Sequence, residues 1–324
     1  MSKTLAVTYE QAVQYRMEVN HLSERLPAGA YLEAAYFGLQ DTAPRDALIG
    51  MHARVADCEP SAWEHPDLTQ TYSPRGAVYV LPKQDLGVFT VGRLPLGEEQ
   101  RSAIEKIADE VCQTLAGKER RGGLPDLRTA CASGRITLRW TTSALYAREV
   151  PRPEIDFADA HRELCRRHLQ AFGPTTPEAF AWWSGLSPRD GREVWRWLVP
   201  ELLPVDLAGH PAWILAKHEQ AIRSTGPAPA ARLLVAPDLR IFGQDKHGLF
   251  VGPGMKRRTH LHDSFHPNGV ILNGKIAGAW GRRGGRIDVR LAAPLSTEAS
   301  AALTAEALSM PIPGVTPTLE QSTS

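Results

Sequence analysis

The chain has 324 residues, of which 43% are hydrophobic and 23% charged, and its formal net charge is +1. This length is enough for two or three domains with apolar cores, and the composition is that of an ordinary globular protein. No apolar run approaches the length of a membrane span, and the N-terminus has no signal-peptide core, so the sequence predicts a cytoplasmic protein that does not enter a membrane.

The residues that often bind metals are not arranged here as a metal site. The four cysteines are scattered without a Cys-x-x-Cys pair: Cys58, Cys112, Cys131 and Cys165. We interpret them as small core residues in a reducing compartment. His260, His262 and His266 cluster, but the basic residues at 256–258 would oppose a cation. The sequence therefore predicts neither a metal nor a cofactor.

The first hundred residues are predicted to contain three helices and then a strand. Thr8 and Gln11 form a possible capping box for the first helix, which ends near Pro27. The remaining elements are expected at 32–39 (helix), about 43–55 (helix) and 72–81 (strand). This is the element order of a winged helix, in which the third helix ordinarily reads DNA.

The same pattern recurs in the middle of the chain. Helices are expected at 100–117, 124–132 and 156–172, with a strand at 135–139. Two shorter helices begin at the cap signals Thr175-Thr-Pro-Glu178 and Ser187-Pro-Arg-Asp190, and strands at 202–207 and 212–215 follow. The tryptophans of this region are expected to pack between helices: Trp182, Trp183, Trp195 and Trp197.

The last hundred residues are predicted to consist mainly of strands. Residues 226–230 have the composition of a linker, and Asn273-Gly274 between apolar runs is a strong hairpin signal. A helix is expected at 297–310, and the tail from Pro311 is expected to be loose. The predicted fold class is α+β, with three winged-helix units at 1–98, 99–225 and 226–324 that form a concave DNA-binding surface.

Positive charge is concentrated in residues 252–290. This segment holds eight lysines and arginines against two aspartates, a net charge of +6, whereas the remainder of the chain sums to −5. Such a patch on a nearly neutral protein favours an anionic polymer bound to one face. The alternative is a charged hairpin that is merely solvated.

The turn Gln40-Asp41-Thr42 is the main candidate for chemistry. It lies before the helix expected at 43–55, with Thr42 in position to cap that helix. Polar side chains at a helix N-terminus can bind a phosphate or position a water. The alternative interpretation is an ordinary turn in which Asp41 and Thr42 only cap the helix.

Several motifs resemble the tandem winged-helix DNA-binding proteins, a family that includes the AlkZ- and AlkX-type DNA glycosylases. They extend from about residue 8 to 310: Arg16 and Leu22, Gly38-Leu-Gln40, His52-Ala-Arg-Val55, Arg75-Gly-Ala-Val-Tyr-Val-Leu81, Arg232-Leu-Leu-Val-Ala-Pro-Asp238 and Val270-Ile-Leu-Asn-Gly-Lys-Ile-Ala-Gly-Ala-Trp280. The resemblance implies three winged-helix units and a monofunctional glycosylase, a hydrolase that removes bulky N7-alkylated purines or unhooks interstrand crosslinks. Self-resistance to a genotoxic antibiotic is one role consistent with that resemblance. It also implies a double-stranded DNA partner, and we expect a monomer.

The family chemistry is associated with a Gln-x-Gln or Gln-x-Asp motif. Gln40 matches its first residue, and Thr42 stands at the third. Gln40, Asp41 and Thr42 are thus the candidate catalytic residues: Gln40 and Thr42 orient water, and Asp41 takes its proton or stabilises positive charge on the sugar, with Asp46 as a second candidate carboxylate. The candidate DNA-binding residues are Arg45, Arg75, Lys256, Arg257, Arg258, Arg282, Arg283 and Arg286.

A protein that binds DNA without catalysis is the competing interpretation. A winged-helix regulator would share the fold and the basic patch. The altered third residue of the motif and Tyr79, which stands where many family members have histidine, also fit a relative that has lost the chemistry.

Overall fold

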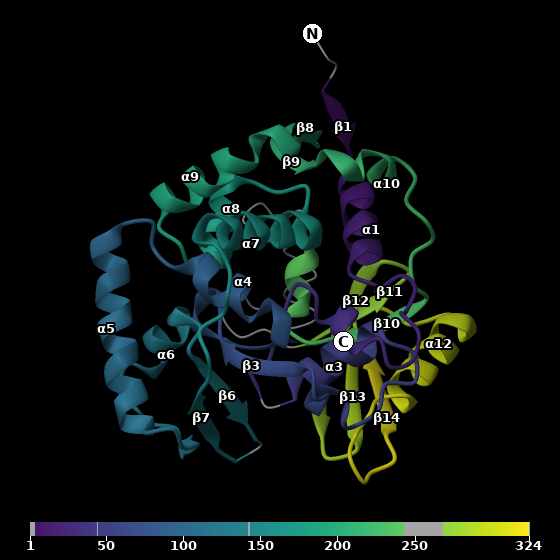
Figure 1. Cartoon of the computed structure of the whole chain (residues 1–324). Coiled ribbons are helices and arrows are strands. Elements are labelled where there is room, and N and C mark those ends of the chain that lie inside the picture. The colour runs from purple at the N-terminus through teal and green to yellow at the C-terminus, as the bar shows by residue number, and fades with distance from the viewer. Residues whose placement is uncertain (1–3, 44, 142, 243–267, 324) are drawn as a thin grey trace.

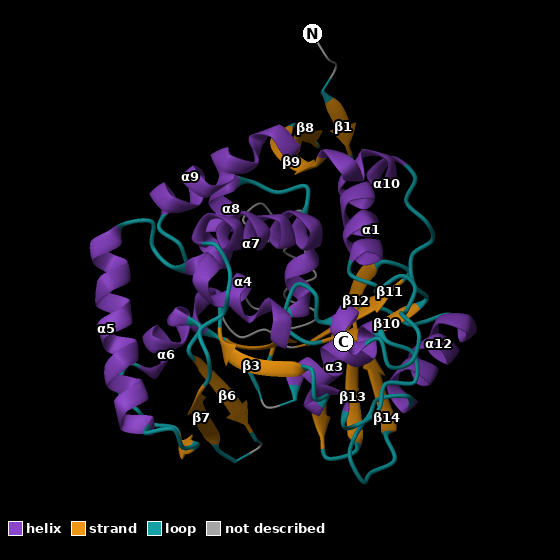
Figure 2. Ribbon diagram, in the orientation of Figure 1, coloured by secondary structure: helices purple, strands orange, loops and turns teal. Residues whose placement is uncertain are grey.

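A computed structural model describes residues 4–43, 45–141, 143–242 and 268–323. Three β-sheets, each with its own helices, make up this part of the chain (Figure 1; Figure 2). The mixed α and β content agrees with the predicted class. In the described residues no helix has the length and apolar character needed to cross a membrane.

The first helix begins where the capping box predicts. The Thr8 hydroxyl accepts from the Gln11 backbone N–H, and the Gln11 side chain accepts from the Thr8 N–H. Helix α1 (Tyr9–Val19) carries the buried Arg16, which donates to the carbonyls of Gly173, Pro174 and Ile241. A single side chain therefore ties α1 to two distant segments.

The six-stranded sheet contains residues from both sides of the boundary predicted at residue 98. Its strand order is β2-β4-β3-β6-β7-β5. The strands are β2 (Leu39–Gln40), β3 (Leu68–Tyr72), β4 (Val78–Pro82), β5 (Arg120–Arg121), β6 (Ile136–Trp140) and β7 (Leu145–Glu149). Helices α5 (Glu98–Leu115) and α6 (Leu127–Ala130) pack on its outer part around Val111, Leu115 and Ile136. The division of the chain into three units thus stays a prediction, and strand pairing crosses its first boundary.

The strand predicted at 72–81 is interrupted. Residues Pro74–Gly76 form a short 3₁₀ turn, and Arg75 has a left-handed backbone with φ of 60°. The interruption separates β3 from β4 and projects Arg75 out of the sheet. A positive φ is unusual for arginine, and no local sequence pattern predicts it.

The middle of the chain matches the predicted elements closely. Its helices are α7 (Phe157–Phe172), α8 (Pro177–Ser184), α9 (Pro188–Leu198) and α10 (Glu219–Arg223), and its strands are β8 (Leu202–Leu207) and β9 (His210–Leu215). Asp156, Thr176 and Ser187 each accept a backbone N–H at the start of their helices. Strand β1 (Leu5–Val7), which periodicity does not predict, pairs with β8 in parallel.

The C-terminal sheet has five strands and one long helix. The strands are β10 (Ala231–Leu234), β11 (Asn268–Leu272), β12 (Lys275–Arg283), β13 (Arg286–Leu291) and β14 (Thr318–Thr323). The hairpin signal is confirmed, because Asn273 and Gly274 both have positive φ. Helix α12 (Thr297–Leu308) packs on the sheet. The prediction of a loose tail is wrong: β14 pairs with β13 over its whole length, since Leu319 packs on the apolar core there.

Helix α3 (Asp46–Arg54) connects the two larger sheets at the centre of Figure 1. It is shorter than predicted, and every residue from Ala47 to Arg54 is buried. Leu48 packs with the core next to β2, whereas Ile49 packs against the five-stranded sheet. A helix buried on all sides cannot enter a DNA groove, so the expectation drawn from ordinary winged helices is wrong for α3. The helix predicted before it is also short, since α2 spans only Tyr31–Ala34 and Leu39 belongs to β2.

Candidate active site

Gln40 lies at the end of β2, opposite Tyr79 of β4. Gly38 precedes it with φ of 76°, and a Cβ at this position would lie 2.9 Å from Cδ1 of Tyr79. Only glycine combines this backbone conformation with such a close approach. The Gly-Leu-Gln motif thus lays β2 directly against the Tyr79 ring and brings the Gln40 side chain to the edge of the sheet.

The amide of Gln40 is held from three directions. Its Oε1 accepts from Nη1 of Arg240 at 2.5 Å and from the Tyr79 hydroxyl at 3.4 Å, and its Nε2 donates to the hydroxyl of Thr42. An amide has two acceptor positions on oxygen and two N–H donors. Gln40 therefore has one N–H left for a ligand, and its oxygen is available only after Arg240 or Tyr79 moves away.

Asp41 accepts a hydrogen bond with its side chain at the start of α3. Its side chain is buried, with the residue 1% exposed, and its Oδ1 accepts from the backbone N–H of Ala47 at 3.0 Å. Burial raises the pKa of the Asp41 carboxyl to about 6, although the backbone N–H groups at the start of α3 and the charge of Arg45 oppose the rise. The Asp41 carboxylate is thus engaged with the start of α3 and does not face solvent.

The predicted cap by Thr42 is wrong. Thr42 is exposed and its hydroxyl accepts from Gln40, whereas the residue before α3 is Arg45, with φ of 86° and no side-chain cap bond. Asp46 accepts from the Ala43 N–H at 3.1 Å instead. Burial raises the pKa of Asp46 to about 6, and the nearby carboxylates of Asp41 and Asp238 contribute to this rise.

The raised pKa of Asp41 gives a prediction for the pH dependence of stability. A carboxyl with a higher pKa in the folded than in the unfolded state binds more protons when folded, so its contribution to stability falls as pH rises from about 4 to about 6. Asp41→Asn removes this titration and keeps an oxygen for the Ala47 N–H. Over this range the wild type is expected to lose about 2–3 kcal/mol relative to the variant, measured by urea unfolding. A difference between the two proteins that does not vary with pH would show that Asp41 titrates normally.

Two arginines of the candidate site have aromatic partners. The Arg75 guanidinium lies 3.7 Å from the ring centroid of Trp182, which is 42% exposed, so this tryptophan lies at the surface and not between helices as predicted. Arg45 lies 3.7 Å from the ring centroid of Trp63, and its Nη1 is buried without a hydrogen-bond partner. The structure therefore presents Arg75 at the surface and packs Arg45 inward.

Tyr79 is surrounded by positive charge. Burial raises the pKa of its phenol, and the charges of Arg240, Arg75 and Arg93 oppose that rise. Burial also lowers the pKa of Arg75, and the charge of Arg240 lowers it further. Among the described residues, none of these arginines forms an ion pair with a carboxylate. Like charges in such an arrangement favour an anion such as a phosphate beside Gln40.

The described part of the basic segment predicted at 252–290, called the basic arm below, includes the β12–β13 hairpin with Arg282, Arg283 and Arg286. Nη1 of Arg282 donates to the Gly284 carbonyl at 2.8 Å, and Arg283 is exposed. Arg286 forms ion pairs with Asp288 at 3.1 Å and Glu320 at 3.4 Å. Lys256, Arg257 and Arg258, together with the histidines near residue 260, lie outside the described residues.

Arg240 is a site residue that the sequence analysis missed. It follows the Arg232–Asp238 motif but is 200 positions from Gln40, and no local pattern indicates that the two residues meet. The short helix η8 (Asp238–Phe242) brings it there, because Asp238 forms a bidentate ion pair with the fully buried Arg54 of α3. Among the described residues, no group of three or more histidine, cysteine, aspartate or glutamate side chains is placed to hold a metal ion. The four cysteines are free and buried, as predicted.

A glutamine held at the edge of a sheet, beside arginines that form no ion pair with a described carboxylate, is suited to binding a phosphate and a water. Comparison with known proteins agrees with such a site. The family model described as DNA glycosylase AlkZ-like matches residues 127–310, more than half of the chain, and the protein belongs to this family.

Two similar proteins come from Streptomyces sahachiroi. One is an interstrand DNA cross-link repair glycosylase, 26% identical over 132 residues. These residues are 40% of this chain and 35% of that protein, so the alignment spans about a third of the relative. The other is the solved structure of the DNA glycosylase AlkZ, which aligns with a TM-score of 0.77 at 17% identity over 99% of this chain and 100% of the other. At this identity the structural match supports the fold alone.

Proposed function

We propose that this protein is a DNA glycosylase that hydrolyses the N-glycosidic bond of bulky N7-alkylated purines and takes part in interstrand crosslink repair. The observation that carries the proposal is Gln40, which occupies the first position of the family motif and is fixed by Arg240, Tyr79 and Thr42. The S. sahachiroi relative is an interstrand DNA cross-link repair glycosylase, which supports the crosslink-repair part of this proposal. Three winged-helix units, at 1–98, 99–225 and 226–324, remain our proposal for the architecture.

The proposed chemistry requires little acid catalysis. A purine alkylated at N7 already carries positive charge and leaves readily, so the protein must position a water and stabilise a positively charged sugar. Gln40 and Thr42 orient the water. Asp41, with a pKa of about 6, is mostly ionised at neutral pH and supplies negative charge close by. Its burial favours this electrostatic role over direct proton abstraction.

The arginines near Gln40 are proposed to hold the DNA backbone. A phosphate bound by Arg75 and Arg240 would release the Gln40 oxygen from Arg240, and it would place negative charge beside the developing sugar cation. The turn carries no lysine between residues 38 and 46, so no amine is available there for a covalent intermediate. This supports a monofunctional hydrolase.

The test of the function is base release from duplex DNA with a single bulky N7-alkylguanine, at enzyme in excess over DNA. We expect the free modified base and an abasic strand whose backbone is intact. Binding without release would favour the competing function, a DNA-binding protein without catalysis. That alternative is supported by Thr42 at the third position of the motif and by the occupied oxygen of Gln40.

The basic arm should contribute to affinity through phosphates. Replacing Arg282 and Arg283 with alanine is expected to weaken binding to all duplex sequences alike and to reduce the salt slope by about one to two. Arg286→Ala is the matched control, because Arg286 is already paired with Asp288 and Glu320 and should change the slope less. Fluorescence anisotropy between 50 and 200 mM salt measures both. An unchanged slope in the double variant would mean that these side chains are only solvated.

A further inference from the structure

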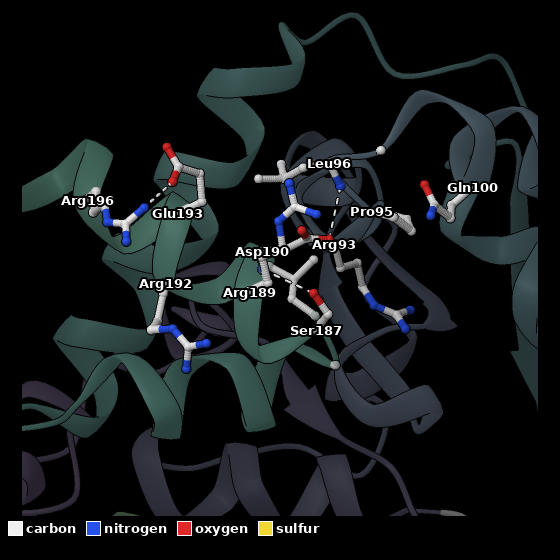
Figure 3. A pocket seen from close by; sticks show the side chains of 13 residues that line it. Arg93, Pro95, Leu96, Gln100, Ser187, Arg189, Asp190, Arg192, Glu193 and Arg196 are labelled. Carbon is white, nitrogen blue, oxygen red and sulfur yellow. Dashed lines mark hydrogen bonds and ion pairs between the residues drawn. The ribbon is translucent and has the colours of Figure 1, made fainter.

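A cavity of about 860 Å³ lies between α9 and the segment that leads from the 3₁₀ turn η4 (Val91–Arg93) to α5 (Figure 3). Its lining includes the four arginines Arg93, Arg189, Arg192 and Arg196 and the two acids Asp190 and Glu193. The lining arginines of α9 recur at helical spacing on the exposed face of that helix. The candidate active site uses none of these α9 residues.

Both acids in the cavity are already engaged. Oδ2 of Asp190 accepts from the backbone N–H of Leu96 at 3.2 Å, which ties the start of α9 to the opposite wall. Glu193 is paired with Arg196 at 2.5 Å. In Figure 3 these contacts are drawn as dashed lines, and no dashed line joins Arg189 or Arg192 to either acid. Within the described chain, Arg189 and Arg192 have no ion pair and remain available.

Arg93 adds a third cation at the inner side of the cavity. Its Nε is buried and has no hydrogen-bond partner, and its Nη1 reaches only the Tyr72 carbonyl at 3.4 Å. Burial lowers the pKa of Arg93 to about 10, and no carboxylate is among the groups that act on it. A guanidinium with an unused donor in an arginine-lined cavity fits an anion with several oxygen acceptors.

The cavity is connected to the candidate active site. A Cβ on Gly185, which lines the cavity, would lie 3.6 Å from the backbone nitrogen of Arg75 and 3.9 Å from Nη2 of Arg93. Arg75 and Arg93, with Arg240, also act on the Tyr79 phenol beside Gln40. Positive side chains therefore continue from the cavity to Gln40 without an intervening carboxylate partner in the described residues.

We propose that this cavity binds a phosphodiester of the DNA backbone, at a position displaced along the strand from the nucleotide that meets Gln40. Arg189 and Arg192 contact the phosphate from α9, Arg93 contacts it from the opposite wall, and the positive end of the α9 dipole adds to the attraction. The inference rests on the proposed function, because it takes duplex DNA as the ligand. It adds a second anchoring point on the middle part of the chain, far in sequence from the basic arm.

The test compares two double variants. Arg189→Ala with Arg192→Ala removes two cavity cations. Lys217→Ala with Arg223→Ala removes two exposed cations that do not line the cavity, one in the 3₁₀ turn just before α10 and one in α10. Binding of an undamaged duplex is measured against salt concentration, and thermal melting by circular dichroism checks that both variants fold. We expect the cavity variant to bind about tenfold more weakly at 0.1 M salt and to lose about one from the salt slope, because one phosphate contact is lost, while the control keeps both values.

The outcomes separate this inference from the proposed function. If the cavity variant keeps the wild-type slope, or if the control loses as much, the cavity is not a phosphate site. If the wild type binds DNA through the cavity and releases no base from N7-alkylguanine duplexes, the inference stands and the glycosylase proposal fails. If the wild type releases base and the cavity variant binds normally, the glycosylase proposal stands and the cavity inference fails.

Discussion

Replacing Gln40 with alanine is expected to lower the single-turnover rate of base release by about a hundredfold, and to change DNA affinity by less than about twofold. The loss corresponds to one polar group that acts on the transition state. Affinity is retained because Gln40 carries no charge and the arginines around it remain. The measurement is base release at saturating enzyme, with binding followed separately by anisotropy.

Thr42→Ala is the comparison variant for Gln40→Ala, because Thr42 is proposed to orient the water together with Gln40. Thr42 is exposed and only accepts from the Gln40 amide, so its loss should cost less than the loss of Gln40. A Gln40 variant that releases base at the wild-type rate would remove this residue from the chemistry. A larger defect in the threonine variant would assign the water to Thr42 instead.

Removing the carboxylate of Asp238 is expected to have the largest effect on stability. Asp238 pairs with Arg54 at 2.7 and 3.1 Å, and the Arg54 side chain is fully buried in α3. Asp238→Ala leaves that guanidinium without a counter-ion in the core, which should lower the free energy of unfolding by about 3–5 kcal/mol. Urea unfolding measures the loss. Since Arg240 lies on the same short helix, base release should fall as well.

Two further variants make the Asp238 prediction specific. Asp288→Asn removes the carboxylate of an exposed ion pair with Arg286, and it should change stability by less than about 1 kcal/mol. Arg54→Met combined with Asp238→Leu removes both buried charges and should recover part of the loss. If Asp238→Ala costs no more than Asp288→Asn, the buried pair does not hold η8 against α3.

Local chemistry made much of the fold predictable. Cap signals in the sequence predict the starts of α1, α8 and α9. Each start depends on a bond between a side-chain oxygen and a backbone N–H fewer than four residues away, so the local sequence contains both partners. Asn273-Gly274 likewise fixes the β11–β12 turn, since both residues adopt the positive φ that such a two-residue turn requires.

Elements that depend on distant partners were not predictable in the same way. Strand β1 has three residues and gains its pairing from β8, about 200 positions away. Strand β14 has the composition of a polar tail, and it is a strand because it pairs with β13. Burial of α3 on all sides also has no local signature, because Arg54 and His52 look like solvent-facing residues in the sequence.

In the candidate site, too, local features were predictable from the sequence and contacts between distant residues were not. The resemblance to the family identifies the Gly38-Leu-Gln40 motif, and the structure gives Gly38 a positive φ, which glycine adopts without strain. The sequence allows either Asp41 or Thr42 to cap the helix and does not decide between them. It also does not indicate that Arg240, 200 positions away, reaches Gln40, because that contact depends on how η8 packs on α3.

The most direct test of the proposed activity is the release of modified base by the wild-type protein from a duplex with one bulky N7-alkylguanine, followed by mass spectrometry with enzyme in excess. The account predicts first-order release of the free base, an intact abasic strand, and a rate about a hundredfold lower for Gln40→Ala. A wild-type protein that binds this duplex but releases no base, or releases it equally well without Gln40, would contradict the account.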